Sequence, residues 1–372
     1  MIETPCLVDQ YCHGVLRTEL GLGTFEAHLG RAPGPPAPGT TFFDTQTGFA
    51  VRRWCPPLLG LEPHCAPARY LARRRELGVL EVGRRLLRGS GITTYLVDTG
   101  LPGDLTGPAE IAAAGGADAH EIVRLELLAE QVADTSGTVD SFLANLAEAV
   151  HGAAGSAVAF SSVASLRQGP ALAPDPPGAG EVRGAAGRWL ADRRVGGSLT
   201  DPVLLRHLLW NAVASGRPLQ LHIGACDPLL LTDFVAAATG LGTDLVLLHG
   251  YPYHRQAAQL AGVHPHVYAD LGPALAHTGA RAATVLAEIL ELAPFGKLLF
   301  SSGARGLPEL HVVRARVFRE ALARTLGGWV DEGVCSHRDA TRVAGMIAAG
   351  NARRVYGLEG ASTDPAERVR PS

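Results

Sequence analysis

The sequence predicts an α/β fold, a (β/α)8 TIM barrel with a helical insertion after the first strand. Two observations carry this prediction. Residues 42–90 read as helical and arginine-rich. Short apolar runs alternate with segments of helical spacing, which is typical of a parallel sheet. The eight predicted strands span 6–9, 93–97, 122–125, 157–161, 219–223, 245–249, 267–270 and 298–301.

Helices are expected between these strands, and one of them has a clear start. Thr200 and Asp201 precede an apolar stretch of helical spacing and are suitable N-caps. The predicted helices span 202–215, 256–262, 280–292, 308–326 and 340–356. Two Pro/Gly-rich segments, 29–41 and 168–180, predict loops. We expect one barrel domain over residues 1–358 and a flexible tail over 359–372.

The composition limits the class of protein. Hydrophobic residues make up 47% of the 372 residues and charged residues 19%, which predicts a folded chain. A net charge of −3 argues against nucleic acid as a partner. No apolar run reaches the length of a membrane span, and the first residues lack a signal-peptide pattern. None of the six cysteines forms a CxxC pair, so we expect a cytoplasmic location.

Functional side chains of a parallel barrel gather where its strands end. His13 follows the first predicted strand, and His222 and His249 lie at the ends of the fifth and sixth. Three imidazoles can bind one zinc ion and leave a position open for water. Asp270 ends the seventh strand and is a candidate general base, together with His222 and His249.

Several motifs resemble the amidohydrolase-related (amidohydrolase 2) branch of the amidohydrolase superfamily. The resemblance extends from about residue 7 to 358 and implies a barrel descended from metal-dependent hydrolases. The motifs are DTG at 98–100, the segment 210–220, HGYPYHR at 249–255, FSS at 300–302, GLPEL at 306–310 and GNARRVYGL at 350–358.

The family's metal site, carried over by this resemblance, is incomplete. The first strand normally offers His-x-His, but here Tyr11 replaces one histidine. Ser161 stands where a bridging anion is expected, and Gly303 stands where the eighth strand normally supplies an aspartate. The only lysine, Lys297, is not on the fourth strand, so it cannot form a carboxylated bridge. We therefore predict no binuclear centre, and either no metal or one divalent ion, with zinc favoured.

Three hypotheses remain open for function. The first is a catalytically silent or repurposed barrel that serves as a binding or assembly subunit. The second is a mononuclear zinc hydrolase that uses His13, His222 and His249. The third is a metal-free lyase, isomerase or cyclisation enzyme acting on an anionic small molecule.

Arg305 places a positive charge near the expected mouth, where it can hold a carboxylate or phosphate. The expected ligand is therefore a small anion, with no nucleic-acid or membrane partner. A homo-oligomer, or an assembly with an active homologue, is a further expectation. The run Arg73–Arg75 predicts a solvated helix face. The predicted ligand-binding residues are Tyr11, Tyr251, His254, His277 and Arg305.

Overall fold

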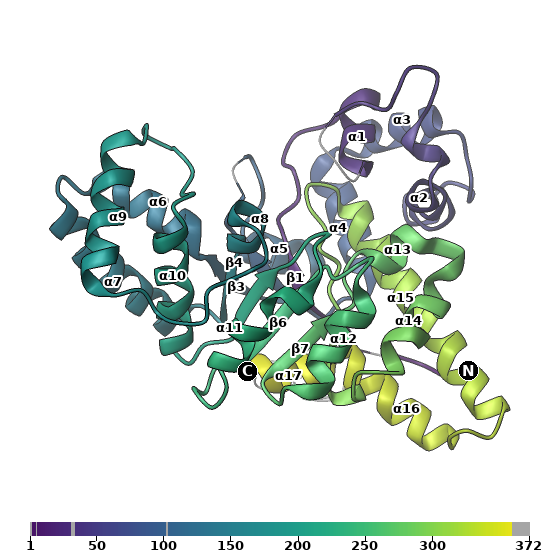
Figure 1. The fold of residues 1–372 in the computed structure, drawn as a ribbon. Coiled ribbons are helices and arrows are strands. Elements are labelled where there is room, and N and C mark those ends of the chain that lie inside the picture. Colours follow the sequence, from purple (N-terminus) through teal and green to yellow (C-terminus); the bar gives the residue numbers. More distant parts are fainter. Residues whose placement is uncertain (1, 5, 31–33, 102, 359–372) are drawn as a thin grey trace, which may run out of the picture.

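Eight parallel strands form a nearly closed barrel in the computed structural model, which describes residues 2–4, 6–30, 34–101 and 103–358 (Figure 1). Each strand pairs with the next along the chain. The main-chain amide of Gln10 donates to the Phe300 carbonyl at 3.1 Å. This bond links the first strand to the residue that follows the last one. The strands are β1 (Val8–Cys12), β2 (Thr94–Asp98), β3 (Asp118–Arg124), β4 (Ala159–Ser162), β5 (Leu219–His222), β6 (Leu245–Leu248), β7 (Val267–Asp270) and β8 (Leu298–Leu299).

The predicted fold class is confirmed, with local shifts in strand position. The largest relevant shift is in β1, which begins two residues after the predicted start and continues through Cys12. Tyr11 therefore lies inside a buried strand rather than after it. The register of β1 with β2 shifts between Asp9 and Cys12, so side chains do not alternate regularly there. Tyr11 lies with Val8 in the barrel interior, whereas Cys12 lies with Asp9 on the other side of the strand.

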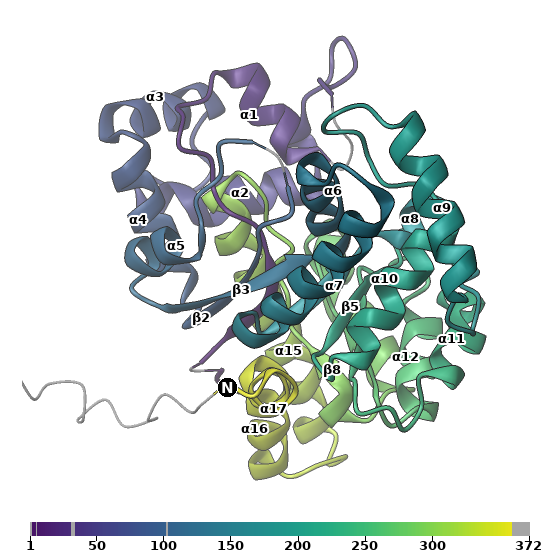
Figure 2. The same ribbon diagram turned by 90° about the vertical axis from the view of Figure 1, so that its left-hand side faces the viewer.

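The barrel interior is apolar near its N-terminal end, as expected for a packed barrel core. Val8, Leu96 and Ile122 belong to one buried cluster with Ala352 and Val355. The last two lie on α17 (Asn351–Tyr356), which closes that end of the barrel. Figure 1 and Figure 2 both place α17 at the end opposite α1 and α3.

The helical insertion after β1 is present, but its bounds differ from the predicted 42–90. It consists of α1 (Leu22–Leu29), α2 (Gln46–Leu58) and α3 (Pro67–Leu77), whereas α4 (Val79–Ser90) packs against α5 and α15 of the barrel. The Arg74 Nε lies 2.8 Å from Glu309 Oε1, and both side chains are almost inaccessible. The prediction of a solvated face at Arg73–Arg75 is therefore wrong for Arg74, which anchors the insertion to α15.

The remaining helices follow the strands around the barrel. The Asp201 side chain accepts from the Val203 and Leu204 amides at 2.9 and 3.2 Å, which confirms the predicted cap. No helix in the described ranges is long and apolar enough to cross a membrane. The predicted tail at 359–372 lies outside the described residues. The helices are α5 (Pro108–Gly115), α6 (Leu125–Thr135), α7 (Val139–Ser156), α8 (Ala164–Gln168), α9 (Ala179–Asp192), α10 (Pro202–Ala214), α11 (Thr232–Ala237), α12 (His254–Val263), α13 (Ala274–Thr278), α14 (Ala282–Leu290), α15 (Pro308–Asp331) and α16 (His337–Gly345).

Candidate active site at the barrel mouth

A cavity of about 610 Å³ opens where the strands end. It brings together most of the side chains that the sequence singles out. Asp270 is absent from its lining and lies behind the His249 ring. His254 is also absent from it and instead places its Nε2 2.7 Å from Glu288 on α14. The predicted residues on the cavity wall are Tyr11, His13, His222, His249, Tyr251, His277 and Arg305.

Tyr11 occupies the centre of the histidine cluster. Its ring lies edge-on to the rings of His13, His222 and His249, with centroids 5.2, 4.9 and 5.4 Å away. Only 1% of Tyr11 is exposed. The three imidazoles therefore pack around a phenol ring.

The Tyr11 hydroxyl is bonded on several sides. It lies 2.8 Å from His13 Nε2, 3.0 Å from Arg124 Nη2 and 3.1 Å from Asp98 Oδ2. His13 Nδ1 lies 2.8 Å from the Asp98 main-chain carbonyl, which can only accept. We therefore assign the imidazole proton to Nδ1. The single Tyr11 hydroxyl proton is assigned to His13 Nε2 rather than to the more distant Asp98 Oδ2, because that oxygen already accepts from Arg124 and Ser161.

Burial keeps both members of this pair neutral. Desolvation lowers the pKa of His13 to about 4, although the Asp98 carboxylate acts in the opposite direction. Desolvation, followed by Asp98, raises the pKa of the Tyr11 hydroxyl well above its usual value. At neutral pH the bond therefore joins a phenol to an uncharged imidazole.

Asp98 and Arg124 form a buried ion pair beside Tyr11. Arg124 Nη2 lies 2.6 Å from Asp98 Oδ2, and Ser161 Oγ donates to the same oxygen at 2.7 Å. Burial opposes ionisation of Asp98, but the charge of Arg124 and the hydrogen bonds from Ser161 and Arg124 bring its pKa below the usual value. Ser161, at the position expected for a bridging anion, thus serves as a donor to Asp98.

Asp98 and Arg124 lie at the candidate site without having been predicted as site residues, although Asp98 begins the DTG motif. They are the last residues of β2 and β3. The predicted site residues all came from the other strand ends. Applying the same strand-end rule to β2 and β3 would have found both.

His249 and Asp270 form a second pair at the base of the cavity. His249 has a left-handed backbone with φ of 63°, and 23% of its side chain is exposed. Its amide donates to Asp270 Oδ2 at 3.3 Å, and its Nδ1 lies 3.5 Å from that oxygen. Burial raises the pKa of Asp270 to about 6, whereas burial and then Arg314 lower the pKa of His249 to about 3.

Gly303 gives the His249 ring its space. A Cβ atom built at Gly303 would lie 2.8 Å from His249 Cε1, and the glycine has φ of +54°. An aspartate at this position would therefore need both a strained backbone and a displaced imidazole. His222 completes the group; its buried Nε2 has no hydrogen-bond partner among the described residues, and burial lowers its pKa well below the usual value.

The cavity wall is strongly basic. Its described residues include three arginines and five histidines but no aspartate or glutamate. Arg314 donates to the Ser302 carbonyl at 2.6 Å, while its buried Nε has no hydrogen-bond partner in the part of the chain that the structure describes. Burial lowers the pKa of Arg314 to about 10, so it stays protonated at neutral pH. The basic residues are Arg124, Arg305, Arg314, His13, His28, His222, His249 and His277.

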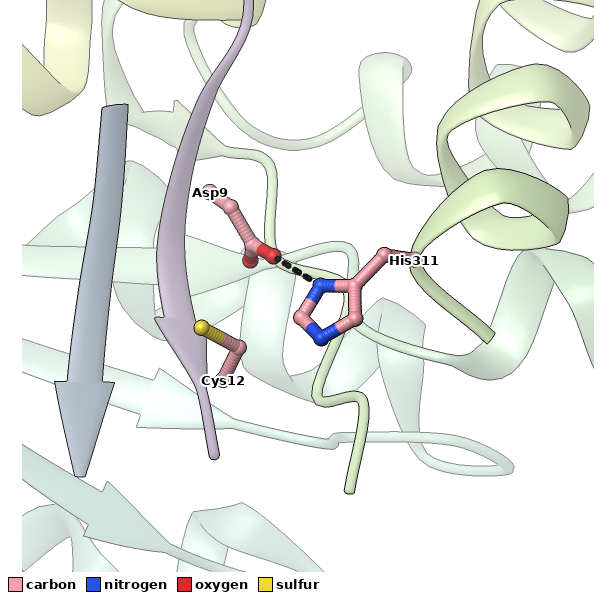
Figure 3. Close-up of side chains that lie close together, drawn as sticks. All are labelled: Asp9, Cys12 and His311. Atoms are coloured by element: carbon pink, nitrogen blue, oxygen red, sulfur yellow. Dashed lines mark ion pairs between the residues drawn. The ribbon is translucent and has the colours of Figure 1, made fainter. Parts of the chain in front are cut away.

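A separate group, Asp9, Cys12 and His311, lies between β1 and α15 (Figure 3). Its candidate ligand atoms lie within 4.8 Å of one another, so it has the residue types of a metal site. However, the Asp9 oxygens already accept from the Ser302 amide at 2.6 Å and from its hydroxyl at 2.5 Å. Asp9 thereby fixes the turn that leads to Gly303, and Cys12, on the same side of β1 as Asp9, does not line the cavity.

The strand ends of this (β/α)8 barrel thus carry a cavity lined by arginines and histidines. The sequence matches the amidohydrolase family over residues 103–358. The chain belongs to this family.

Comparisons with individual proteins agree on the fold. A putative metal-dependent hydrolase from Lactobacillus casei superposes with a TM-score of 0.82 at 24% identity, covering 100% of this chain and 98% of that one. A glucuronate isomerase from Caulobacter crescentus has a TM-score of 0.63 at 14% identity, covering 96% and 92%. At these identities the likeness extends to the fold alone.

The chain is also 35% identical to Protein fluG of Emericella nidulans over 153 residues. That match covers 38% of this chain and 18% of fluG, so the chain spans less than a fifth of that relative.

Proposed function

We propose that this barrel binds a small anionic molecule at its mouth without a metal ion, and that Tyr11 takes the place of the family's metal centre. The observation that carries this proposal is the bond between the Tyr11 hydroxyl and His13 Nε2 at 2.8 Å. A histidine binds metal through a free nitrogen lone pair. His13 Nδ1 is turned to the Asp98 carbonyl, and its Nε2 accepts from Tyr11, so His13 has no lone pair to offer.

Two further features make the histidine cluster a poor binding site for a metal ion. Arg124 brings a guanidinium to within 3.0 Å of the Tyr11 hydroxyl, and its positive charge would repel a cation. Gly303 supplies no carboxylate, and the His249 ring leaves no room for one. His222 and His249 alone are fewer ligands than zinc sites use. The mononuclear hydrolase hypothesis is therefore the weaker one.

The basic wall favours a ligand that carries a carboxylate or phosphate. Arg124 is neutralised by Asp98, whereas Arg314 has no carboxylate within ion-pair distance among the described residues and Arg305 is exposed at the rim. A guanidinium binds a planar carboxylate through two parallel hydrogen bonds. Arg305 and Arg314 are therefore the groups that would hold the anion.

Binding can be measured by isothermal titration of chelator-treated protein with a panel of mono-, di- and tricarboxylates and phosphate esters. We expect at least one to bind, with affinity about tenfold lower in Arg305→Gln because one charge-assisted contact is lost. Arg183→Gln, at an exposed position on α9 outside the cavity, is the matched control. Absence of binding across the panel, or equal loss in both variants, would contradict the proposal.

A second proposal is proton transfer to or from the bound anion by His249, with Asp270 behind it. Its support is the 3.5 Å approach of His249 Nδ1 to Asp270 Oδ2, with the other side of the ring open to the cavity. A bound anion would offset the charge of Arg314, which depresses the pKa of His249 after burial. The imidazole would thus become more basic when the ligand is present.

Deuterium exchange tests this second proposal without a known substrate. Carboxylates that bind are incubated with the protein in D2O, and loss of their C–H signals adjacent to the carboxylate is followed by NMR. We expect exchange that His249→Gln and Asp270→Asn both abolish while anion binding persists. Binding without exchange would leave a binding protein and refute the catalytic role.

A further inference from the structure

Four buried polar side chains form a connected group inside the barrel, below the cavity. The Tyr356 hydroxyl donates to Gln10 Oε1 at 2.5 Å, and Gln220 Nε2 lies 2.8 Å from the same oxygen. Gln10 Nε2 in turn donates to Asp270 Oδ1 at 3.1 Å. We call Gln10, Gln220, Tyr356 and Asp270 the interior polar chain; all four are less than 9% exposed.

The bonds of this chain fix which way the Gln10 amide faces. A glutamine side chain has an accepting oxygen and a donating nitrogen, and the two can exchange places by a rotation. Here two donors, Tyr356 and Gln220, converge on Oε1. We assign the NH2 group to Asp270, because the ionised carboxylate can only accept.

Asp270 is consequently held at both oxygens. Gln10 donates to Oδ1, and the His249 amide donates to Oδ2, which also lies 3.5 Å from His249 Nδ1. This places the carboxylate against the imidazole.

We propose that Gln10 is a positioning residue for Asp270, and that Tyr356 on the terminal helix α17 sets the orientation of the Gln10 amide. The inference rests on the proposed pairing of Asp270 with His249. It assigns α17 a function in addition to closing the end of the barrel.

Stability alone does not account for these polar groups. Barrel interiors are usually filled by branched apolar side chains. Replacing hydrogen-bonded partners by apolar groups of the same shape is often nearly neutral for folding. The buried Gln220 Oε1 atom moreover has no hydrogen-bond partner within the described ranges, which costs free energy.

The surroundings of Asp270 define what a change in this chain should do. The groups that act on it are the Ser301 side chain, the Gly272 and His249 main-chain amides and the Gln10 side chain from β1. The His249 ring after β6 also faces it, and the neutral Tyr356 hydroxyl reaches it through Gln10. Arg314 and His277 act on His249. Since the Gln10 amide donates to the charged form of Asp270, its loss should make this carboxyl group harder to ionise.

The test is an NMR titration of the Asp270 carboxyl carbon in the full-length, ligand-free protein. We expect Gln10→Leu to raise the titration midpoint by about one pH unit. Tyr356→Phe keeps the ring and should raise the midpoint by a smaller amount, because only Gln220 then holds the Gln10 oxygen away from Asp270. The double variant should shift no further than Gln10→Leu. Tyr95→Phe, at a buried hydroxyl bonded to Ser90 on the outer side of β2, should change nothing.

Three results would overturn the inference. These are an unmoved midpoint in Gln10→Leu, an unmoved midpoint in Tyr356→Phe, or additive shifts in the double variant. If Gln10→Leu does not fold, the isosteric Tyr356→Phe still decides the question. Because no ligand is present, failure of anion binding and failure of this inference are separate outcomes.

Discussion

Removing the Tyr11 hydroxyl is the most direct perturbation of the site. In Tyr11→Phe the ring still fills the space between the three imidazoles, so no cavity forms. The hydroxyl's bonds to His13 Nε2 at 2.8 Å and to Arg124 Nη2 at 3.0 Å are lost. Arg124 keeps Asp98, but His13 Nε2 is left buried without a donor.

The expected cost follows from that unpaired nitrogen. Leaving one buried polar group unsatisfied costs about 1–3 kcal/mol. We therefore expect the free energy of unfolding at pH 7 to fall by about 2 kcal/mol, a roughly thirtyfold change in the folding equilibrium. Urea denaturation followed by circular dichroism measures it.

Tyr95→Phe is the matched control, because that buried hydroxyl has longer bonds, 3.2 Å to Ser90 Oγ and 3.3 Å to the Leu87 carbonyl. It should cost about 1 kcal/mol. A loss below about 0.5 kcal/mol in Tyr11→Phe would refute the assigned hydrogen bond.

Three further predictions concern stability. Gly303→Asp should lower the free energy of unfolding, measured by urea denaturation, by about 2 kcal/mol, because the backbone is strained and the side chain clashes with His249. An unchanged free energy of unfolding would contradict this prediction. Since the pKa of His13 is about 4 when folded and about 6.5 when unfolded, its contribution is present above pH 6.5 and lost as pH falls toward 4. Between pH 7 and 5 the wild type should lose about 2 kcal/mol more than His13→Gln, and parallel pH profiles would argue against it. Arg74→Met should lower the free energy of unfolding by about 3–5 kcal/mol, because buried Glu309 is left without its partner. The double variant Arg74→Met/Glu309→Leu should recover most of this loss. Equal losses in the single and the double variant would contradict the pairing.

The fold could be predicted because its signals are local. Apolar runs and helical spacing lie within short windows, and the Asp201 cap bonds to the next two or three residues. The cavity wall was also largely predictable, since strand ends meet at one face of the barrel. The substitutions at Tyr11 and Gly303 were visible in the sequence alone.

What the substituted residues do could not be predicted, because their partners are distant in sequence. Tyr11 meets Arg124 across 113 positions, and Gln10 meets Tyr356 across 346. Arg74 looked solvated because nothing in its own segment reveals Glu309, more than two hundred residues away. Side chains that pair across the barrel are set by tertiary packing rather than by local spacing.

Zinc titration of the chelator-treated protein tests the central claim most directly. The wild type and His13→Ala should give the same result, with no zinc held at the barrel mouth. Cys12→Ser is the control that separates any binding by the Asp9, Cys12 and His311 group. One equivalent of tightly bound zinc that persists in Cys12→Ser and disappears in both His13→Ala and His222→Ala would contradict the replacement of the metal centre by Tyr11.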